Sequence, residues 1–256
     1  CGWYYMEQKK KGVSLPPIGV KFHGYEMFQE LSSFSQKLKA FLLKSPTRWN
    51  NEHADFVFSY GGKITELILN VFNVSSDQIL EFTSGIDNDW IRKSDPVLRK
   101  GKIKFVFVGR DEKRKGVNEL NKALKELLNH IDFEFHFIGP ISQDKKIENN
   151  AITYHGELKN KESLIAVLDE MDILVCPSHS EGMPNVILEG MARGLAVLAT
   201  DVGAVEFVVD SNNGKIILPL NQQILKASIK EFAQIERPNL QEMKLNSLKK
   251  IENKYL

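Results

Sequence analysis

The stretch that decides the fold is residues 172–200, DILVCPSHSEGMPNVILEGMARGLAVLAT. Its apolar run at residues 173–176 predicts a buried strand, which a loop follows. Pro184 lies where a helix can begin, because its missing N–H costs nothing in a first helical turn. Gly194 can end that helix as a left-handed cap, and residues 196–199 predict a further strand. The succession of strand, loop, helix and strand is typical of parallel sheets.

The same alternation continues along the chain in both directions. Strands are predicted at residues 18–22, 55–59, 79–82, 103–108, 133–138, 152–154, 173–176, 196–199 and 215–218. Helices are predicted at residues 27–43, 62–71, 117–130, 161–169, 186–193 and 222–232. Two of these helices have apolar stripes that we expect to face the core, Phe28, Leu31, Phe34, Leu38, Phe41 and Leu42 in the first and Leu120, Ala123, Leu124, Leu127 and Leu128 in the second. We therefore predict an α/β fold with parallel sheets that helices cover on both faces.

A polar, proline-containing stretch at residues 87–102 divides the chain into two halves. It directly precedes residues 103–108, the strongest strand prediction. We therefore predict one domain at residues 1–92 and another at residues 93–256.

The composition argues against two classes of protein. Lys and Arg number 34 and Asp and Glu number 33, a formal net charge of +1, whereas a nucleic-acid-binding surface is expected to be basic. No apolar stretch approaches the roughly 18 residues of a membrane-spanning helix, and no signal peptide is visible. The two cysteines, Cys1 and Cys176, form neither a disulfide framework nor a metal-ligand spacing. We expect a cytoplasmic protein in which Cys176 is a small buried residue.

The loop and helix after residues 173–176 contain the best candidates for ligand binding. Ligands bind at the carboxyl ends of parallel strands, and free N–H groups near residues 183–185 would face an anion there. Glu181 on the loop and Glu189 on the helix can point into one cleft and contact two hydroxyl-bearing parts of one ligand. The alternative is that both are solvated surface carboxylates.

A second candidate follows the strand predicted at residues 103–108. Gly109 permits a tight turn and a close approach of the backbone. Arg110 and Lys115 bracket the loop, where their charges can neutralise a diphosphate. The alternative is a solvated basic turn.

These motifs resemble glycosyltransferase family 4, whose members are retaining enzymes of the GT-B class with two Rossmann-like domains. Pro-Ser before Glu181 and Glu-Gly-Met-Ala-Arg-Gly from Glu189 match the family's E-x7-E signature. The resemblance implies that Glu181 lies beside the donor sugar and that Glu189 binds the ribose hydroxyls of the nucleotide. It also implies that Arg110 and Lys115 clamp the diphosphate. Further donor contacts are expected from Gly109, Gly182, Met183, Pro184, Asn185 and Gly203.

The resemblance extends from about residue 18 to the end of the chain. Residues 82–87, FTSGID, are similar to the hinge of the family, although Thr83 and Ser84 replace its usual Pro-Asn. His23, in the segment FHGYE, resembles the acceptor-domain histidine that approaches the donor sugar, and a purely structural histidine is the alternative. Residues 1–17 do not supply the family's first strand and Gly-rich loop, so we expect the first domain to be incomplete.

The function that the resemblance implies is transfer of a hexose from a nucleoside-diphosphate sugar, of UDP or GDP type, to a glycan or lipid-linked acceptor with retention of configuration. A bacterial polysaccharide or lipopolysaccharide pathway fits by analogy. No Asp-x-Asp pair stands in the donor loops, so we expect basic residues in place of a metal and no cofactor. Glu181, His23, Arg110 and Lys115 are the candidate catalytic residues. The alternatives are a non-catalytic subunit or fragment that binds nucleotide sugars and a GT-B sugar-nucleotide epimerase.

A basic, amphipathic segment lies in the first half of the chain. Residues 37–44, KLKAFLLK, are followed by Arg48. Such a segment can bind peripherally to the anionic inner face of the cell membrane. The alternative is a packed helix with solvated lysines.

Overall fold

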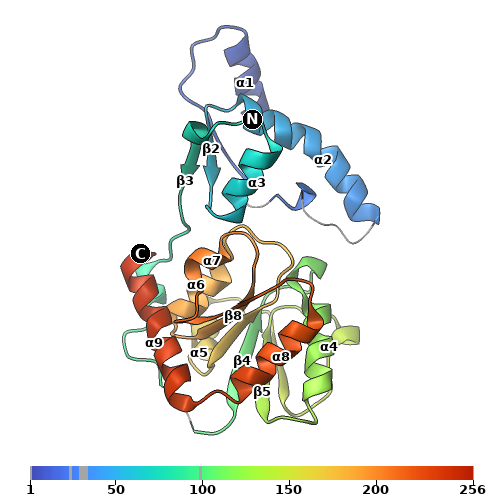
Figure 1. The fold of residues 1–256 in the computed structure, drawn as a ribbon, viewed down its shortest axis with the longest axis vertical. Helices are drawn as coiled ribbons and strands as arrows, with labels where there is room; N and C mark the ends of the chain where they lie inside the picture. Colours follow the sequence, from blue (N-terminus) through green and yellow to red (C-terminus); the bar gives the residue numbers. More distant parts are fainter. Residues whose placement is uncertain (1, 23–24, 29–33, 98–99, 256) are drawn as a thin grey trace. The chain divides into compact units, whose positions relative to one another are not determined.

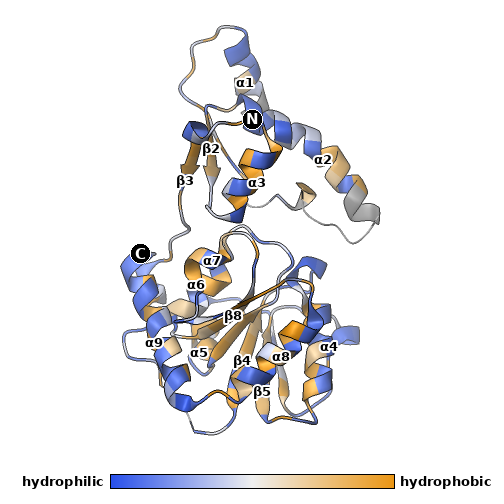
Figure 2. Ribbon diagram, in the orientation of Figure 1, coloured by the Kyte–Doolittle hydropathy of each residue, from blue (hydrophilic) through white to orange (hydrophobic). Residues whose placement is uncertain are grey.

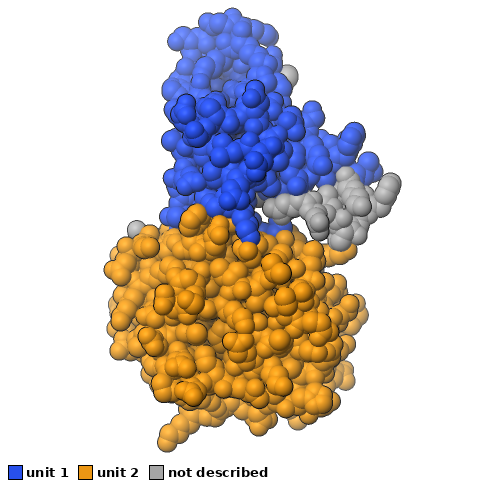
Figure 3. All heavy atoms as spheres, viewed as in Figure 1, with its two compact units in different colours: residues 1–84, 180–183 blue, residues 85–179, 184–256 orange. Residues whose placement is uncertain are grey.

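The computed structural model describes residues 2–22, 25–28, 34–97 and 100–255 (Figure 1). Its contacts divide the chain into two compact units (Figure 3). Unit 1 comprises Cys1–Ser84 with Ser180–Met183, and unit 2 comprises Gly85–His179 with Pro184–Leu256. The domain boundary after residue 92 stays a prediction. None of the helices formed by the described residues combines the length and the apolar character that crossing a membrane requires.

Unit 1 is built on a three-stranded parallel sheet. Its strands lie in chain order, β1 (Gly19–Lys21), β2 (Phe56–Ser59) and β3 (Ile79–Glu81). Its helical elements are α1 (Gly2–Lys10), η1 (Glu26–Phe28), α2 (Phe34–His53), α3 (Lys63–Val71) and η2 (Ser76–Gln78). A small core joins the sheet to α3 and consists of Tyr25, Val57, Ile64, Ile68, Phe72 and Val74. The three strands and α3 confirm the sequence prediction to within one or two residues.

Helix α2 differs from the prediction in its extent and in the face that it buries. It continues through Pro46 to His53, and the predicted core residues Leu38, Phe41 and Leu42 are 54%, 73% and 65% exposed. Among the side chains of α2 that the structure describes, the buried ones lie on another face and are Ala40, Thr47 and Asn51.

A hydrogen bond to the core explains which face is buried. The Tyr25 hydroxyl donates to Asn51 Oδ1 (2.9 Å), and Asn51 Nδ2 donates to Thr47 O (2.8 Å). The apolar stripe therefore turns outward, and its assignment to the core was wrong for Leu38, Phe41 and Leu42. Phe28 does pack against the core as predicted. Leu31 and the side chain of Phe34 lie outside what the structure describes.

Unit 2 is built on a six-stranded sheet in which every neighbouring pair is parallel. The order is β6-β5-β4-β7-β8-β9. The strands are β4 (Ile103–Val108), β5 (Phe133–Ile138), β6 (Ile152–Gly156), β7 (Ile173–Cys176), β8 (Ala196–Thr200) and β9 (Gly214–Ile217). Figure 2 shows that these strands are predominantly hydrophobic, as strands buried on both faces of a parallel sheet are expected to be. The predicted parallel α/β fold is confirmed.

The helices of unit 2 are α4 (Val117–Leu127), α5 (Lys161–Leu168), α6 (Asn185–Ala192), α7 (Val205–Val208), α8 (Gln222–Ala233) and α9 (Arg237–Lys254). Leu120, Ala123, Leu124 and Leu127 are buried as predicted, and Leu128 packs at the border of the same core. The sequence did not predict α9. Its buried face includes Lys244 and Ser247, so no clean apolar stripe marks it.

Candidate functional site

Unit 2 has its topological switch point between β4 and β7. The strand order runs outward from β4 through β5 to β6, and the chain then returns to place β7 on the other side of β4. In open parallel sheets, ligands bind outside the carboxyl ends of the strands where the order reverses. The loops that follow β4 and β7 are therefore where a binding site is expected.

The loop after β4 begins at a close contact between two glycine backbones. Gly109 donates its N–H to Ile138 O (2.9 Å) at the end of β5. Gly139 has a φ of +123°, and a Cβ on it would lie 2.0 Å from Gly109 O. A side chain at residue 139 is therefore excluded, and the carboxyl ends of β4 and β5 are held together.

The same loop carries the predicted cationic residues. Arg110 is 79% exposed, and its Nη1 lies 3.8 Å from Glu112 Oε1. The 3-10 turn η4 (Lys113–Lys115) follows, and Gly116 ends it with a φ of 70°. Arg110 and Lys115 therefore lie on one short loop at the carboxyl end of β4.

The loops after β4 and β7 are in direct contact. A Cβ on Gly116 would lie 2.0 Å from Pro177 O, so only glycine fits at this position. The backbone N–H of His179 donates to Arg114 O (2.6 Å). His179 Nε2 also lies 3.1 Å from Glu119 Oε2 in the first turn of α4.

The loop after β7 is also fastened on its other side. The Thr200 hydroxyl, at the end of β8, donates to the carbonyl oxygen of Ser178 and lies 3.3 Å from that of Cys176. Ser178 and Cys176 are both buried, as the sequence predicted for Cys176. The start of this loop is therefore fixed by β8 and by the loop after β4.

Helix α6 lies within one residue of the limits, 186–193, that its sequence predicts. Pro184 precedes its first residue, with a φ of −74° and a ψ of 106°. Gly194 follows its end with a φ of +74°, and a Cβ there would lie 2.8 Å from Pro96 Cβ. The predicted left-handed cap is confirmed, and the helix begins beside Pro184 as predicted, although Pro184 is its extended N-cap and not a residue of its first turn.

The orientation of α6 is fixed by Arg193, the residue that directly follows it. Arg193 Nε and Nη2 each lie 2.8 Å from an oxygen of Asp169, and Nη1 donates to Trp90 O (2.8 Å). A paired guanidinium and carboxylate of this geometry are more rigid than a single contact. The segment around Trp90 and the end of α5 therefore hold α6 at its C-terminus.

Glu189 lies on α6 in a half-buried position. Burial raises the pKa of its carboxyl above the usual value, and the positive charge of Lys161 at the start of α5 lowers that pKa again. A carboxylate in a half-buried position is suited to accept hydrogen bonds from hydroxyl groups of a ligand.

The family can be identified by comparison with known proteins. The family model of the glycosyl transferases group 1 matches residues 102–234, more than half of the chain. The chain belongs to this family. A putative teichuronic acid biosynthesis glycosyltransferase, TuaC of Bacillus subtilis, is 32% identical over 140 residues. An uncharacterized glycosyltransferase of Methanocaldococcus jannaschii is 40% identical over 134 residues.

These alignments cover only part of each protein. They include 53% of this chain and 34% of TuaC, and 50% of this chain and 37% of the archaeal protein, about a third of each relative. Sucrose-phosphate synthase from Thermosynechococcus elongatus aligns in structure over 99% of this chain and 67% of its own, with a TM-score of 0.78 and 19% identity. That similarity establishes the fold class, GT-B, with parallel sheets of Rossmann type.

The residues predicted for this group 1 glycosyl transferase fall into three sets. Unit 2 contains Gly109, Arg110, Lys115, Pro184, Asn185, Glu189 and Gly203. Unit 1 contains Glu181, Gly182 and Met183, which belong to the segment Ser180–Met183. His23 lies outside the described residues. Gly203 has a φ of +58° between β8 and α7, a backbone conformation that favours glycine. Their roles in donor binding stay predictions.

Several residues that shape the site were not predicted. His179 lies inside the best sequence motif, but its partner Glu119 is 60 residues away in the chain. Thr200 closes the first strand that follows the motif, and its bond to Ser178 is equally non-local. Pairwise contacts of this kind leave no periodic pattern in the sequence, so only the fold reveals them.

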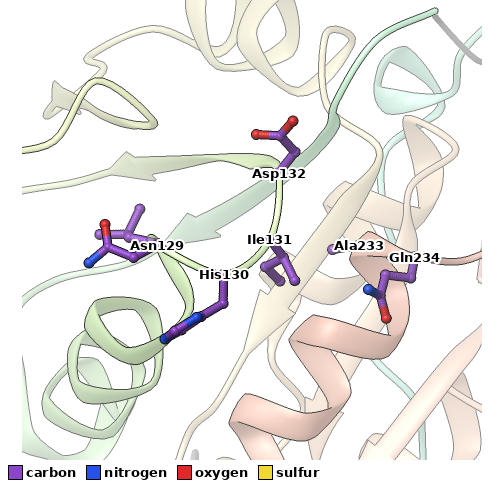
Figure 4. A pocket seen from close by; sticks show the side chains of 7 residues that line it. Asn129, His130, Ile131, Asp132, Ala233 and Gln234 are labelled. Atoms are coloured by element: carbon purple, nitrogen blue, oxygen red, sulfur yellow. The ribbon is translucent and has the colours of Figure 1, made fainter.

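An open hollow of about 520 Å³ lies at the opposite, amino end of the sheet (Figure 4). Leu128, Asn129, His130, Ile131, Asp132, Ala233 and Gln234 line it. None of them is a predicted donor residue, and the site at the carboxyl ends is favoured by the topology. Among the residues that the structure describes, no group of three or more His, Cys, Asp or Glu side chains is placed to hold a metal ion.

Proposed function

We propose that this chain binds a nucleoside-diphosphate sugar at the carboxyl ends of β4, β7 and β8 and serves in glycosyl transfer. The observation that carries the proposal is the direct contact between the loops after β4 and β7 at the topological switch point. Membership of the group 1 glycosyl transferases supports it. UDP and GDP conjugates are the proposed donors, and a glycan or a lipid-linked glycan is the proposed acceptor.

The chemistry assigned to the loop after β4 is stabilisation of the leaving group. When the bond between sugar and diphosphate breaks, negative charge grows on the diphosphate. Arg110, Lys115 and the backbone N–H groups at the start of α6 are proposed to bind that charge. Fixed charges and dipoles of this kind supply a large part of many rate enhancements, because they need no reorganisation during the reaction.

The carboxylates are proposed to orient the two other parts of the donor. Glu189 would accept hydrogen bonds from the ribose hydroxyls, and Glu181 would lie beside the sugar ring. His23 is proposed to approach the sugar from the acceptor half. Retention of configuration, transfer of a hexose without a metal ion, and family 4 membership rest on the sequence resemblance. The role of TuaC in teichuronic acid biosynthesis supports a polysaccharide or lipopolysaccharide pathway.

Calorimetric titration with UDP, GDP and their common sugar conjugates tests the donor site. We expect one nucleotide to bind, and we expect Lys115→Ala and Glu189→Ala to weaken it by about tenfold or more each, since hydrogen bonds to charged groups contribute roughly 1.5–3 kcal/mol. Lys125→Ala and Glu162→Ala, which change exposed residues of α4 and α5, are the matched controls. Equal affinity for all five proteins would remove the proposed site, and absence of binding to any nucleotide would remove the proposed function.

We also propose that α2 contacts an anionic membrane surface at the inner face of the cell membrane. Phe41 and Leu42 are exposed on this helix beside the exposed Lys39 and Lys44. Bulky apolar side chains enter the interface while lysines contact anionic headgroups. Flotation with vesicles that contain phosphatidylglycerol should show binding that the double variant Phe41→Ser, Leu42→Ser abolishes.

The matched control for this experiment is Leu69→Ser, Leu80→Ser, which changes exposed apolar residues on α3 and β3. The control should bind like the parent chain. If the parent chain does not float with anionic vesicles, the membrane proposal is wrong. Contact of the exposed face of α2 with another protein would then be the alternative.

A further inference from the structure

We infer that His179 is a positioning residue, which holds the loop after β7 against the loop after β4 and thereby orients Lys115 for a diphosphate. This inference rests on the proposed donor site. It assigns His179 no contact with the ligand, because its imidazole Nε2 is turned to Glu119.

The histidine makes two bonds to two different parts of the neighbouring loop. Its backbone N–H donates to Arg114 O (2.6 Å), in the 3-10 turn that contains Lys115. Its Nε2 lies 3.1 Å from Glu119 Oε2, on the first turn of α4. One residue therefore ties both the turn and the helix that follows it to the end of β7.

The position of Lys115 depends on these contacts, because both of its sequence neighbours are fastened to the loop after β7. Arg114 accepts the backbone bond from His179, and Gly116 lies so close to Pro177 that no Cβ fits between them. The Arg114 side chain is held as well, with its Nε 2.8 Å from Glu112 Oε2. The backbone position of Lys115 is therefore fixed on both sides by contacts of its neighbours.

The side chains of His179 and Glu119 are sufficiently buried for their interaction to contribute to the stability of the loops. The side chains of His179 and Glu119 are 13% and 27% exposed, so water screens their interaction less than it screens a surface pair. The hydrogen bond from His179 is the largest influence on Glu119 and lowers the pKa of that carboxyl. Glu119 is therefore held ionised, as an acceptor for the imidazole N–H.

The other side of the loop is held by β8. Thr200 donates to the carbonyl oxygen of Ser178, and Ser178 is fully buried. His179 is thus the last residue of this loop in unit 2 before the segment Ser180–Met183, which carries Glu181.

Two measurements on four variants test the inference. The variants are His179→Ala, Glu119→Ala, the double variant and His179→Gln, whose amide Nε2 can donate in place of the imidazole Nε2. Hydrogen exchange of the chain without ligand reports on residues 113–119 and 177–179, and calorimetry reports the affinity for the nucleotide that the parent chain binds.

We expect faster exchange in both segments for the two alanine variants, with an affinity about five- to tenfold lower for each. The double variant should be no weaker than the weaker single variant, since residues that act as one unit are not additive. His179→Gln should bind within about twofold of the parent, as expected where a hydrogen bond has been kept. The affinity of the folded chain separates a positioning role from a purely stabilising contact, because a contact that only stabilises the fold leaves that affinity unchanged.

Each other outcome contradicts the inference. Unchanged affinity in His179→Ala, additive losses in the double variant, or a glutamine variant as weak as the alanine variant would each overturn it. If the parent chain binds no nucleotide, the proposed function fails and the positioning role fails with it. Faster hydrogen exchange in the alanine variants would in that case show only that the contact between His179 and Glu119 stabilises the two loops. If the parent binds and the variants bind equally, only this inference fails.

Discussion

Helix α4 of unit 2 and helix α2 of unit 1 carry similar apolar stripes but have different surroundings. In α4, Leu120 and Leu124 are completely buried against the sheet and α8. In α2, Phe41 and Leu42 are largely exposed, and the buried face contains Asn51. The comparison shows that an apolar periodicity indicates which face of a helix is apolar. Whether that face is buried depends on which other elements pack against it. The stripe on α4 is core, whereas Leu38, Phe41 and Leu42 of the stripe on α2 are exposed, and the proposed membrane contact is one use for that face.

The largest contrast is expected between two lysines, one in each unit. Lys244 is 2% exposed, and its Nζ lies 2.8 Å from Asp172 Oδ1 and 3.1 Å from Met171 O. Lys244→Met should cost about 3–5 kcal/mol of unfolding free energy, because it leaves the buried carboxylate of Asp172 without its charged partner, with only the Lys104 N–H still donating to Oδ2 (3.0 Å). Lys39→Met on the exposed face of α2 is the control and should change stability by less than about 0.5 kcal/mol.

Urea denaturation measures the free energy of unfolding of both lysine variants. A loss below about 1 kcal/mol for Lys244→Met would mean that Asp172 is not buried as a charge in unit 2. The double variant Lys244→Met, Asp172→Asn should recover part of the lost stability, because it removes the unpaired charge while the Asn side-chain oxygen can still accept from the Lys104 N–H.

Two leucines give the next largest contrast and test the comparison directly. Leu124→Ala in α4 should cost about 2–5 kcal/mol, since it leaves a cavity in the core. Leu42→Ala in α2 should cost less than about 0.5 kcal/mol in the chain alone. Equal losses in urea denaturation would show that the stripe on α2 is packed in solution and would break the comparison.

Alanine substitutions at two glycines with positive φ distinguish the cost of backbone strain from the cost of a steric clash. Gly12 has a φ of +85° and no heavy atom within 4 Å of an added Cβ, whereas Gly116 has a φ of +70° and a Cβ there would meet Pro177 O. Gly12→Ala should cost only about 1–2 kcal/mol of left-handed strain. Gly116→Ala should lose more stability and also weaken nucleotide binding by about tenfold or more, because the loops after β4 and β7 must separate. Unchanged affinity in calorimetry would contradict the proposed role of that contact.

The smallest effect concerns the carboxyl of Glu189. Burial raises its pKa in the folded chain, so the folded state holds its proton to a higher pH than the unfolded state does. Ionisation of Glu189 therefore costs stability above its unfolded pKa of about 4.3, and the cost is complete once the pH exceeds the folded pKa. Glu189→Gln should consequently melt at a higher temperature than the parent at pH 7, with the difference disappearing as the pH falls to about 4.

Nucleotide affinity should change in the opposite sense. As the pH falls through the raised pKa, Glu189 gains a proton and loses acceptor capacity for ribose hydroxyls. Parent affinity should therefore fall with pH, and Glu189→Gln should bind weakly at every pH. If Glu189→Gln binds the nucleotide as tightly as the parent chain, Glu189 has no role in donor binding and its burial only lowers the stability of the folded chain.

The sequence predicted the fold of unit 2 best where local patterns and tertiary structure agree. The strands Ile103–Val108, Phe133–Ile138 and Ile173–Cys176 have the predicted limits, because the inner strands of a parallel sheet are continuous apolar runs. Pro184 and Gly194 mark the ends of α6 for reasons that belong to their own backbones. Helix α9 was missed, since its buried face includes a charged Lys244 whose partner Asp172 is far away in the chain.

The candidate site could be predicted as a set of residue types but not as an assembly. The sequence places Arg110, Lys115 and Glu189 after the strands or on the helix where the structure has them. It gives no indication that His179 meets Glu119 or that Gly116 meets Pro177, because these contacts depend on which strands become neighbours. The roles of the site residues in binding and transfer stay predictions.

The central claim is that a nucleotide binds at the carboxyl ends of the strands of unit 2. Hydrogen exchange of the parent chain with and without saturating UDP or GDP tests it most directly. The account predicts slower exchange with one of the two nucleotides at residues 109–119, 177–179 and 185–189. Protection at residues 128–134 and 233–234, around the hollow at the amino end of the sheet, or no protection with either nucleotide, would contradict it.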